Sequence, residues 1–300
     1  MTFYVEDEIA SQPDCWARAM ELAGTVAERL PQRGERVAFV GCGTSWFMGQ
    51  VAAAWWEAQG HGEADAFTAA EFPYHRRYDR IVAITRSGTT SEVLEVLRNV
   101  KGRVATTVLL GAQDTPALEV ADAAVDLSFA DEQSVVQTRF ATTVLALLRA
   151  HIGVPSDGLL DAARDAIAVE LPAEWVTAEE VTFVGQGWTV GLAHEAALKF
   201  RESSSSWAES YPAMDYRHGP ISIAAPNRLV WSFGAPPEGL AGQVTATGAT
   251  FITHDRDPMA DLVTAQRLAI ARAVHLGLNP DQPRNLTRSV VLDDSDTGDS

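Results

Sequence analysis

Short apolar runs alternate with longer segments of helical periodicity along the first half of this chain. The runs have the length of buried strands, whereas the segments between them repeat apolar residues at helical spacing. The runs are Val37–Val40, Ala64–Thr68, Arg80–Thr85, Val104–Leu110 and Ala124–Leu127. Helices are expected over residues 3–30, from Thr44 or Ser45 to Gly60, over Glu92–Asn99 and over Glu132–Ala150. This alternation predicts an α/β fold in which helices cover both faces of a parallel sheet.

The second half repeats the start of the first half. The stretch Val37-Ala-Phe-Val-Gly-Cys-Gly-Thr-Ser45 returns, changed, as Val181-Thr-Phe-Val-Gly-Gln-Gly-Trp-Thr189. Each copy predicts a buried strand, a Gly-x-Gly turn and the start of a helix. After the second copy, we expect a helix through Glu202, a loop over Ser203–Pro220, strands at Arg228–Phe233 and Thr250–Thr253, and a helix over about Asp261–Gly277.

This repeat predicts two tandem three-layer α-β-α subdomains, each with a parallel sheet flanked by helices. We expect an N-terminal helical segment at 1–30, a first subdomain at 31–155, a helical linker at 156–174 and a second subdomain at 175–292. Residues 293–300 are acidic and rich in serine, which predicts a disordered tail.

Composition and charge narrow the class of partner. The chain is 46% hydrophobic and 21% charged, as is typical of a soluble globular protein. Its net charge of −17 argues against nucleic acid or an anionic membrane as the main partner. No apolar run is as long as a membrane span and no signal-peptide pattern is present, so a cytoplasmic protein is expected. Cys15 and Cys42 fit neither a disulfide framework nor a metal site, and no metal or cofactor is expected.

Hydroxyl side chains gather where two predicted strands end. Gly41-Cys-Gly-Thr-Ser45 follows the first strand, and Thr85-Arg-Ser-Gly-Thr-Thr90 follows the third. The carboxyl ends of parallel strands open on one crevice, where backbone N–H groups of a helix start can hold an anion. Ser and Thr are also common helix caps, so one such turn alone would be a weak signal. Two turns predict a phosphate site, formed by the Gly43 backbone and the hydroxyls of Thr44, Ser45, Thr85, Ser87, Thr89 and Thr90.

Three further polar segments are candidates for chemistry. Glu195, Lys199 and Glu202 share one face of a predicted helix; this spacing favours a solvated salt bridge, although a buried carboxylate there could act as a base near a sugar carbon. His218 precedes a Gly-Pro pair on a constrained turn, where a lone histidine more often bonds to the backbone. The segment Asp281–Val290 is too polar and too rich in proline for a core strand, and by itself it indicates a surface loop.

Together these segments resemble the sugar isomerase (SIS) family, in particular the isomerase half of glucosamine-6-phosphate synthase and related deaminases and isomerases. The matching pieces span nearly the whole chain in the expected order. They are Gly41–Ser45, Ser87–Thr90, Glu195–Lys199 with Glu202, His218–Pro220 and Asp281–Leu286. The resemblance implies an enzyme that opens the ring of a hexosamine 6-phosphate and moves a proton between C1 and C2.

For the first half, the resemblance implies a substrate-binding role. Ser45, Thr85, Ser87 and Thr90, with nearby backbone, would hold the sugar phosphate. Gln137 stands where the family has a serine that contacts the substrate.

For the second half, the resemblance implies the catalytic roles. Glu202 would be the base, and Glu195 and Lys199 would organise that base and the sugar hydroxyls. His218 would open the ring, donated by the partner subunit of a homodimer whose sites are shared across the interface.

The chain departs from the family pattern in three ways. A length of 300 residues leaves no room for a glutaminase domain, so we expect that the chain cannot by itself draw ammonia from glutamine. Arg86 replaces a glutamine in the phosphate loop and is expected to add a bidentate anion contact. Arg288 stands where the synthase has a lysine that forms a Schiff base with the keto sugar, and an arginine cannot do so.

The reaction is therefore open among isomerase, deaminase and lyase. A lyase would use the same base to eliminate water from an N-acetylhexosamine 6-phosphate, and Arg288 in place of lysine favours it. A non-catalytic sugar-phosphate sensor is an alternative from another class. The presence of both Glu202 and His218 argues against it, as does the lack of a basic DNA-binding module.

Overall fold

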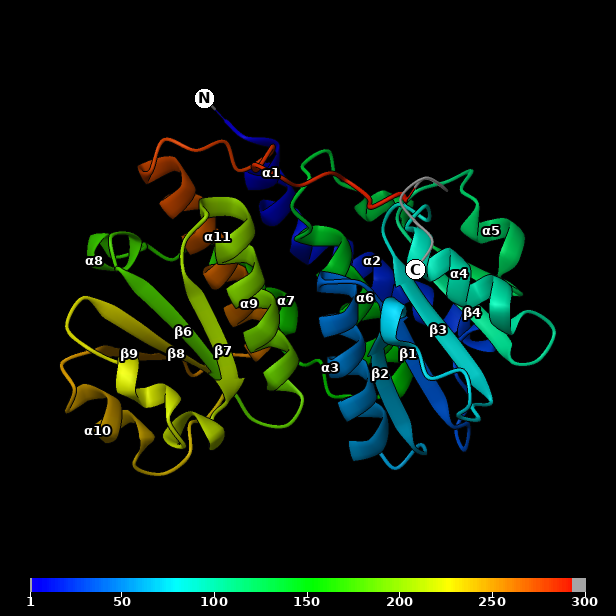
Figure 1. The fold of residues 1–300 in the computed structure, drawn as a ribbon, viewed down its shortest axis with the longest axis horizontal. Helices are drawn as coiled ribbons and strands as arrows, with labels where there is room; N and C mark the ends of the chain where they lie inside the picture. The colour runs from blue at the N-terminus through cyan, green and yellow to red at the C-terminus, as the bar shows by residue number, and fades with distance from the viewer. Residues whose placement is uncertain (1, 293–300) are drawn as a thin grey trace, which may run out of the picture.

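Two parallel sheets stand side by side in the computed structural model, which describes residues 2–292 (Figure 1). The strand order is β2-β1-β3-β4-β5 in the first sheet and β7-β6-β8-β9 in the second. The strands are β1 (Val37–Gly41), β2 (Ala64–Thr68), β3 (Arg80–Thr85), β4 (Ala105–Leu110), β5 (Ala123–Asp126), β6 (Glu180–Gly185), β7 (Ala208–Pro212), β8 (Arg228–Phe233) and β9 (Thr250–Thr253). In both sheets the first strand lies inside, with the next strand in the chain at the edge.

Helices cover both faces of the sheets. They are α1 (Tyr4–Ala10), α2 (Gln12–Thr25), α3 (Thr44–Ala58), α4 (Ser91–Val100), α5 (Ala117–Val120), α6 (Arg139–Ile152), α7 (Leu159–Ala168), α8 (Ala173–Val176), α9 (Thr189–Ser204), α10 (Leu240–Thr245) and α11 (Pro258–His275). Alternate strand residues enter opposite cores, because side chains alternate across a sheet. Phe39 of β1 packs with helices α2, α3 and α6, while the neighbouring Ala38 and Val40 pack with α4. The predicted three-layer α-β-α architecture is confirmed.

One hydrophobic core joins the two halves. It contains buried side chains from α3 and α6 of the first half and from β6, α9 and α11 of the second. Helices α3 and α9 therefore lie side by side between the two sheets (Figure 1). This contact brings the helix that follows β1 against the helix that follows β6.

The two Gly-x-Gly turns have the same backbone shape. Gly43 and Gly187, at corresponding positions, both have a φ of 53°, which favours glycine. A Cβ on Gly41 would lie 2.6 Å from the Ser45 Cβ, and one on Gly185 would lie 2.4 Å from the Thr189 carbonyl oxygen. Each strand end therefore needs its first glycine for a close turn and its second for the φ angle, as the repeat predicts.

Two helix predictions need correction. The predicted helix over 3–30 is divided at Ser11 into α1 and α2, because Pro13 occupies the first turn of α2 and could not continue a helix from α1. The helix expected from Glu132 begins only at Arg139. Glu132 lies outside it, where its carboxylate accepts hydrogen bonds from the backbone N–H groups of Thr138 and Arg139.

The loop predicted over Ser203–Pro220 contains an unpredicted strand. This strand, β7, is a five-residue edge strand that pairs only with β6 and ends at Pro212. Its sequence is polar and most of its residues are partly exposed, so it lacks the apolar run of a central strand. The short helix α10 was not predicted either.

After α11 the chain crosses back to the first half. The last described residues, 286–292, lie along the start of α4 and are here named the C-terminal strap (Figure 1). The Ser91 N–H donates to the Val290 carbonyl oxygen, and the Leu292 N–H donates to the Ser91 hydroxyl. The tail predicted at 293–300 lies outside the described residues.

Candidate functional site

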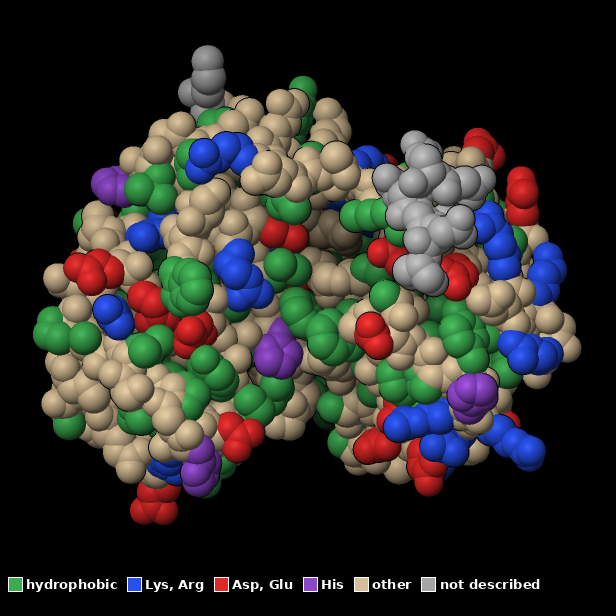
Figure 2. All heavy atoms as spheres, in the orientation of Figure 1, with side chains coloured by type: hydrophobic (Ala, Val, Ile, Leu, Met, Phe, Trp, Pro, Cys, Tyr) green, Lys and Arg blue, Asp and Glu red, His purple; other side chains and the backbone are tan. Residues whose placement is uncertain are grey.

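A cavity of about 200 Å³ lies at the carboxyl ends of β1 and β3. The chain leaves these neighbouring strands toward opposite sides of the sheet, since β1 leads to the edge strand β2 and β3 leads to β4. Such a switch in direction is where open α/β sheets bind ligands. The surface is hollowed between the two halves (Figure 2). The lining residues from the sequence prediction are Gly43, Thr44, Ser45, Thr85, Arg86, Ser87, Thr90, Gln137, Glu202 and Arg288.

The wall on the β3 side is a cluster of hydroxyl groups. Ser289 of the C-terminal strap lies among the hydroxyls of the loop that follows β3. Its Oγ lies 3.1 Å from the Oγ of Ser87, 2.9 Å from the Oγ1 of Thr89 and 3.4 Å from that of Thr90. Hydroxyls and N–H groups at a helix start form a neutral site for an oxyanion. We name these four residues the hydroxyl cradle.

The opposite wall carries three ionisable residues of α9. The Nζ atom of Lys199 lies 2.5 Å from the Oε2 atom of Glu202 and 3.5 Å from the Oε1 atom of Glu195. It also donates to the Thr44 hydroxyl at 2.9 Å. Glu195 and Lys199 are buried, with side-chain exposures of 0% and 2%, whereas Glu202 lines the cavity and is 20% exposed. The solvated salt bridge that the spacing favoured is therefore wrong.

Burial sets the charge states in this cluster. Burial raises the pKa of Glu195 to about 7, against the opposing charge of Lys199. Burial alone would lower the pKa of Lys199, but the carboxylates of Glu195 and Glu202 raise it above its ordinary value. Lys199 is therefore an ammonium at neutral pH, while Glu195 is poised to hold a proton. Burial and the nearby Glu92 raise the pKa of Cys42, at the cavity edge, to about 11, so this cysteine remains a thiol.

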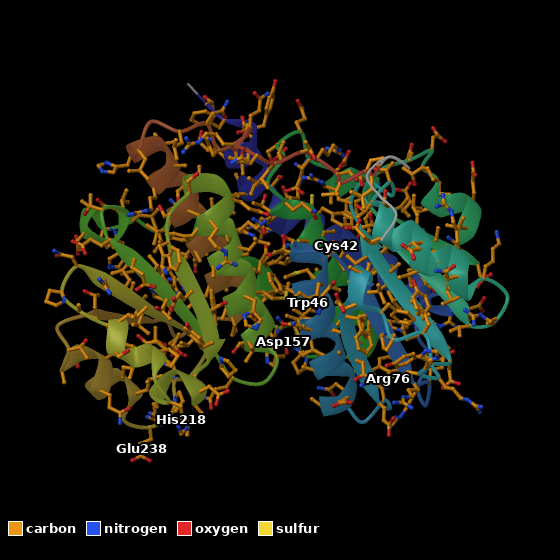
Figure 3. The ribbon with its side chains drawn as sticks, in the orientation of Figure 1. Cys42, Trp46, Arg76, Asp157, His218 and Glu238 are labelled. Atoms are coloured by element: carbon orange, nitrogen blue, oxygen red, sulfur yellow. The ribbon has the colours of Figure 1, made fainter. Side chains whose placement is uncertain are left out.

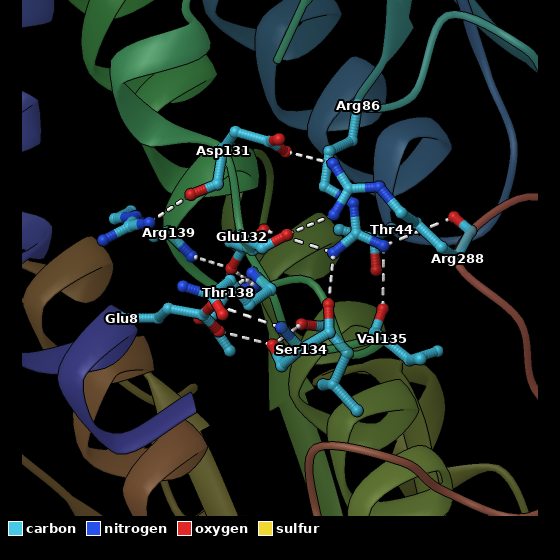
Figure 4. A network of polar contacts seen from close by, with 12 residues as sticks. Glu8, Thr44, Arg86, Asp131, Glu132, Ser134, Val135, Thr138, Arg139 and Arg288 are labelled. Atoms are coloured by element: carbon cyan, nitrogen blue, oxygen red, sulfur yellow. Dashed lines mark hydrogen bonds and ion pairs between the residues drawn. The ribbon is translucent and has the colours of Figure 1, made fainter. Parts of the chain in front are cut away.

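Arg86 has a different environment from the one predicted. It is 2% exposed, and its guanidinium donates to the carbonyl oxygens of Ser134 at 3.0 Å and Val135 at 2.9 Å (Figure 4). Its Nη1 atom also lies 3.6 Å from Glu132 Oε2. The expectation of a bidentate anion contact is wrong for this structure, because backbone carbonyls already occupy both ends of the fork.

Arg288 is held at the rim of the cavity. Its guanidinium forms an ion pair with Asp131 and donates to the Glu132 carbonyl oxygen (Figure 4). Gln137 also lines the cavity, and its buried Oε1 atom has no hydrogen-bond partner among the described residues. An unpartnered buried acceptor is costly, so Gln137 is suited to receive a hydrogen bond from a ligand.

His218 lies outside this cavity. It follows a short 3₁₀ turn beyond β7 and is exposed at the far end of the second half, well away from Cys42 (Figure 3). The chain therefore does not bring its own imidazole to the cavity. The donation of His218 by a partner subunit stays a prediction.

Comparison with known proteins shows which domain family the first half matches. Residues 31–152, which contain the two hydroxyl-rich turns and Gln137 but not Ser289 of the strap, match the SIS domain family. This segment is a SIS domain. The second half repeats its turn and strand order, and the predicted tandem arrangement of SIS-type subdomains is confirmed by the fold.

Several curated relatives of this chain are aminotransferases. The glutamine–fructose-6-phosphate aminotransferase (isomerizing) of Xylella fastidiosa is 27% identical, over 97% of this chain and 59% of its own length. That of Pseudomonas aeruginosa is 28% identical, over 91% of this chain and 54% of its own length. The chain thus spans little more than half the length of these relatives.

Solved structures share the fold over nearly the whole chain. A glucosamine-6-phosphate deaminase from Thermotoga maritima has a TM-score of 0.81 at 23% identity, covering 95% of this chain and 99% of its own. A tagatose-6-phosphate ketose/aldose isomerase from Escherichia coli has a TM-score of 0.76 at 20% identity, covering 95% and 96%. The chain therefore has the fold of phosphosugar isomerases and deaminases.

Several residues that line the cavity were not predicted from the sequence. Val135 and the strap residues Leu286, Ser289 and Val290 all line the cavity. The Asp281-Gln-Pro-Arg-Asn-Leu286 motif was the available signal. Asp281 accepts hydrogen bonds from the Tyr4 and Val5 N–H groups at the start of α1, and its carbonyl oxygen accepts from the Val135 N–H. The motif therefore anchors the chain immediately before the strap.

Neither a metal centre nor a membrane span is found in residues 2–292. No three His, Cys, Asp or Glu side chains in that range are grouped so that they could hold a metal ion. No helix within the same range is long and apolar enough to cross a membrane.

Proposed function

We propose that this protein moves a proton between C1 and C2 of a phosphorylated sugar, with a hexosamine 6-phosphate as its substrate. The observation that carries this proposal is the two-sided cavity, which is lined on one side by the hydroxyl cradle at the end of β3 and on the other by the Glu202 carboxylate of α9. The cradle suits a phosphate, and a carboxylate that is oriented by a buried ammonium suits a base. The relatives support the substrate class, because their names carry fructose 6-phosphate, glucosamine 6-phosphate and tagatose 6-phosphate.

In the proposed reaction, the phosphate occupies the cradle and the open-chain sugar extends toward Glu202. The carboxylate removes the proton from C2, the electron pair of that bond forms a C1–C2 double bond, and the C1 oxygen gains a proton. Return of the proton to C1, with loss of the proton on the C2 hydroxyl, gives a ketone at C2. An amino group at C2 loses an N–H proton instead and gives a C2 imine, which water hydrolyses to the C2 ketone and ammonia. Lys199 orients Glu202, and Thr44 orients Lys199.

The test is a panel of hexosamine and N-acetylhexosamine 6-phosphates, with ammonia, ketose and ultraviolet absorbance followed together. Glu202→Gln should lower kcat at least a hundredfold, roughly the contribution of a general base. Glu238→Gln, at an exposed position outside the cavity, is the control and should keep full activity. Full turnover by the Glu202 variant would show that another group is the base.

A second candidate is a lyase that eliminates water from an N-acetylhexosamine 6-phosphate. The observation that favours it is the state of Arg288, whose guanidinium is bound to Asp131 and to the Glu132 carbonyl oxygen, so that no free amine replaces the family lysine. In the same panel, new ultraviolet absorbance without ammonia would support the lyase, and ketose formation with ammonia would contradict it. Stoichiometric binding without turnover would indicate a sensor.

A further inference from the structure

Arg86 contacts two walls of the cavity with one guanidinium group. The first wall is the segment between β5 and α6, residues 131–138, here named the cavity loop, which carries Val135 and Gln137. Arg86 donates to the carbonyl oxygens of Ser134 and Val135 within it. The second wall is the C-terminal strap, where Arg86 donates to the Arg288 carbonyl oxygen at 3.3 Å. Both walls are thus fixed to the end of β3, from which the hydroxyl cradle begins.

The strap also binds the cavity loop directly, through the side chain of Arg288. Arg86 binds the backbone of the strap at residue 288, and the side chain of Arg288 binds the backbone of the cavity loop at residue 132 (Figure 4). Asp131 completes this exchange through its ion pair with Arg288. The strap and the cavity loop therefore hold each other through two arginines that lie more than 200 positions apart in the chain.

The cavity loop has further supports that do not involve the strap. Glu8 of α1 accepts hydrogen bonds from the N–H groups of Gln133, at 2.5 Å, and Ser134, at 3.2 Å. Glu132 accepts from the N–H groups of Thr138 and Arg139 and lies beside Arg86, which balances its buried charge. Loss of Arg288 should therefore loosen the strap and leave the loop in place, whereas loss of Arg86 should loosen both.

We propose that Arg86 is a positioning residue that couples the cavity loop to the C-terminal strap, so that both walls are assembled around the cradle as one unit. Its side chain lines the cavity, but its guanidinium bonds to the backbone carbonyls of the two walls, so we propose that it acts on binding through those walls. A lysine has a single ammonium and cannot span carbonyls in both walls as the planar guanidinium does. A glutamine has only one amide group to donate.

Hydrogen exchange tests this coupling without any substrate. Arg86→Gln should raise the exchange rates of peptides from residues 131–138 and from 286–292 together, and Arg86→Lys should raise them less. Arg288→Gln should raise the exchange of the strap alone. The matched control is Arg267→Gln, because Arg267 makes comparable bonds to the carbonyl oxygens of Ala166 and Val169 away from the cavity. Arg267→Gln should leave the exchange rates of both segments unchanged.

The activity measurement rests on the proposed function. Arg86→Gln should raise the KM for the phosphosugar about tenfold or more with kcat little changed, because the charge-assisted bonds that assemble the binding walls are lost while Glu202 and Lys199 remain. Arg86→Lys should recover part of this loss. An effect on kcat alone would contradict a positioning role in binding.

Two outcomes would overturn the coupling. One is unchanged exchange in either segment of Arg86→Gln, and the other is an equal change in Arg267→Gln, which would indicate general loosening. If Arg86→Gln does not fold, the other two variants still test the coupling. The exchange of the cavity loop should rise in Arg86→Lys and stay unchanged in Arg288→Gln. If the wild type turns over no sugar of the panel, the proposed function fails, while the exchange result still decides the role of Arg86.

Discussion

At the scale of single residues, burial decides which of the charged side chains on α9 take part in the site. The i, i+4 and i+7 spacing of Glu195, Lys199 and Glu202 would be the same on a solvated helix. In the folded chain, Lys199 is enclosed by two carboxylates and the Thr44 hydroxyl, and Glu195 is fully buried. Water screens the attraction between exposed charges, so an ion pair on the surface is weak. Burial removes this screening, and the side chains therefore form a cluster in which the pKa values of Glu195 and Lys199 are shifted.

The raised pKa of Glu195 predicts a specific dependence of stability on pH. Its pKa rises from 4.5 in an exposed chain to about 7 in the fold. Between these values the folded protein retains a proton that the unfolded chain has lost, so stability falls as the pH rises through this window and is constant above it. Glu195→Gln should therefore lose less stability than the wild type between pH 4.5 and pH 8, by on the order of 3 kcal/mol.

Urea unfolding of both proteins at a series of pH values measures this difference. Glu238→Gln, at an exposed position, is the control and should follow the wild type. Parallel pH curves for the wild type and Glu195→Gln would contradict the shifted pKa.

At the scale of elements, the contact between α3 and α9 determines whether the two walls of the cavity meet. The helices approach closely at Gly191, where a Cβ would lie 2.7 Å from Val51 Cγ2 and 2.8 Å from the Phe47 carbonyl oxygen. The backbone of α3 cannot give way as a flexible side chain could. The small residue at 191 therefore sets the distance over which Lys199 reaches Thr44.

Gly191→Ala should push the two helices apart. We expect a loss of about 1–3 kcal/mol in stability, the usual cost of overpacking, and a lower kcat/KM on the substrate identified from the panel, since the Lys199–Thr44 bond would lengthen. Thermal unfolding and steady-state kinetics measure the two effects. Gly24→Ala in α2 is the control, because nothing lies within 4 Å of a Cβ there, and it should be neutral or slightly stabilising. Equal behaviour of the two variants would contradict the steric argument.

At the scale of the whole molecule, no histidine that could open a sugar ring is among the described residues that line the cavity. The hydroxyl cradle, Glu202 and the strap come from segments spread over the chain and meet at the junction of its halves. His218 lies at the far end of the second half (Figure 3). If the imidazole is needed, it must come from a second copy, and a symmetric dimer would place two such sites across one interface.

Mixing two inactive variants tests for shared sites. Glu202→Gln and His218→Ala should each be inactive. After they are unfolded together and refolded as an equal mixture, about half of the dimers contain one chain of each kind, and one of their two sites has both intact residues. We therefore expect about a quarter of the wild-type activity. Activity no higher than that of the separate variants would contradict donation across the interface, as would a single chain mass in analytical ultracentrifugation.

Local patterns were sufficient for much of the fold and for part of the site. Buried strands such as β3 and β8 have continuous apolar runs, and the two Gly-x-Gly turns need glycine for steric reasons that hold in any context. The edge strand β7 could not be predicted, because its pairing partner β6 lies about thirty residues earlier and its own side chains are polar. The late start of α6 was also beyond prediction, since Glu132 caps that helix from outside instead of starting it.

The sequence by itself determined the repeat, the alternation of strands and helices, the two hydroxyl-rich turns and the residues Glu195, Lys199 and Glu202. These follow from steric and periodic rules that act over a few neighbouring residues. Only the tertiary structure decided that Arg86 serves the backbone of the cavity walls, that Ser289 joins the cradle, and that His218 lies away from both. Each of these depends on burial and on contacts between distant segments, which are set by the packing of the two halves.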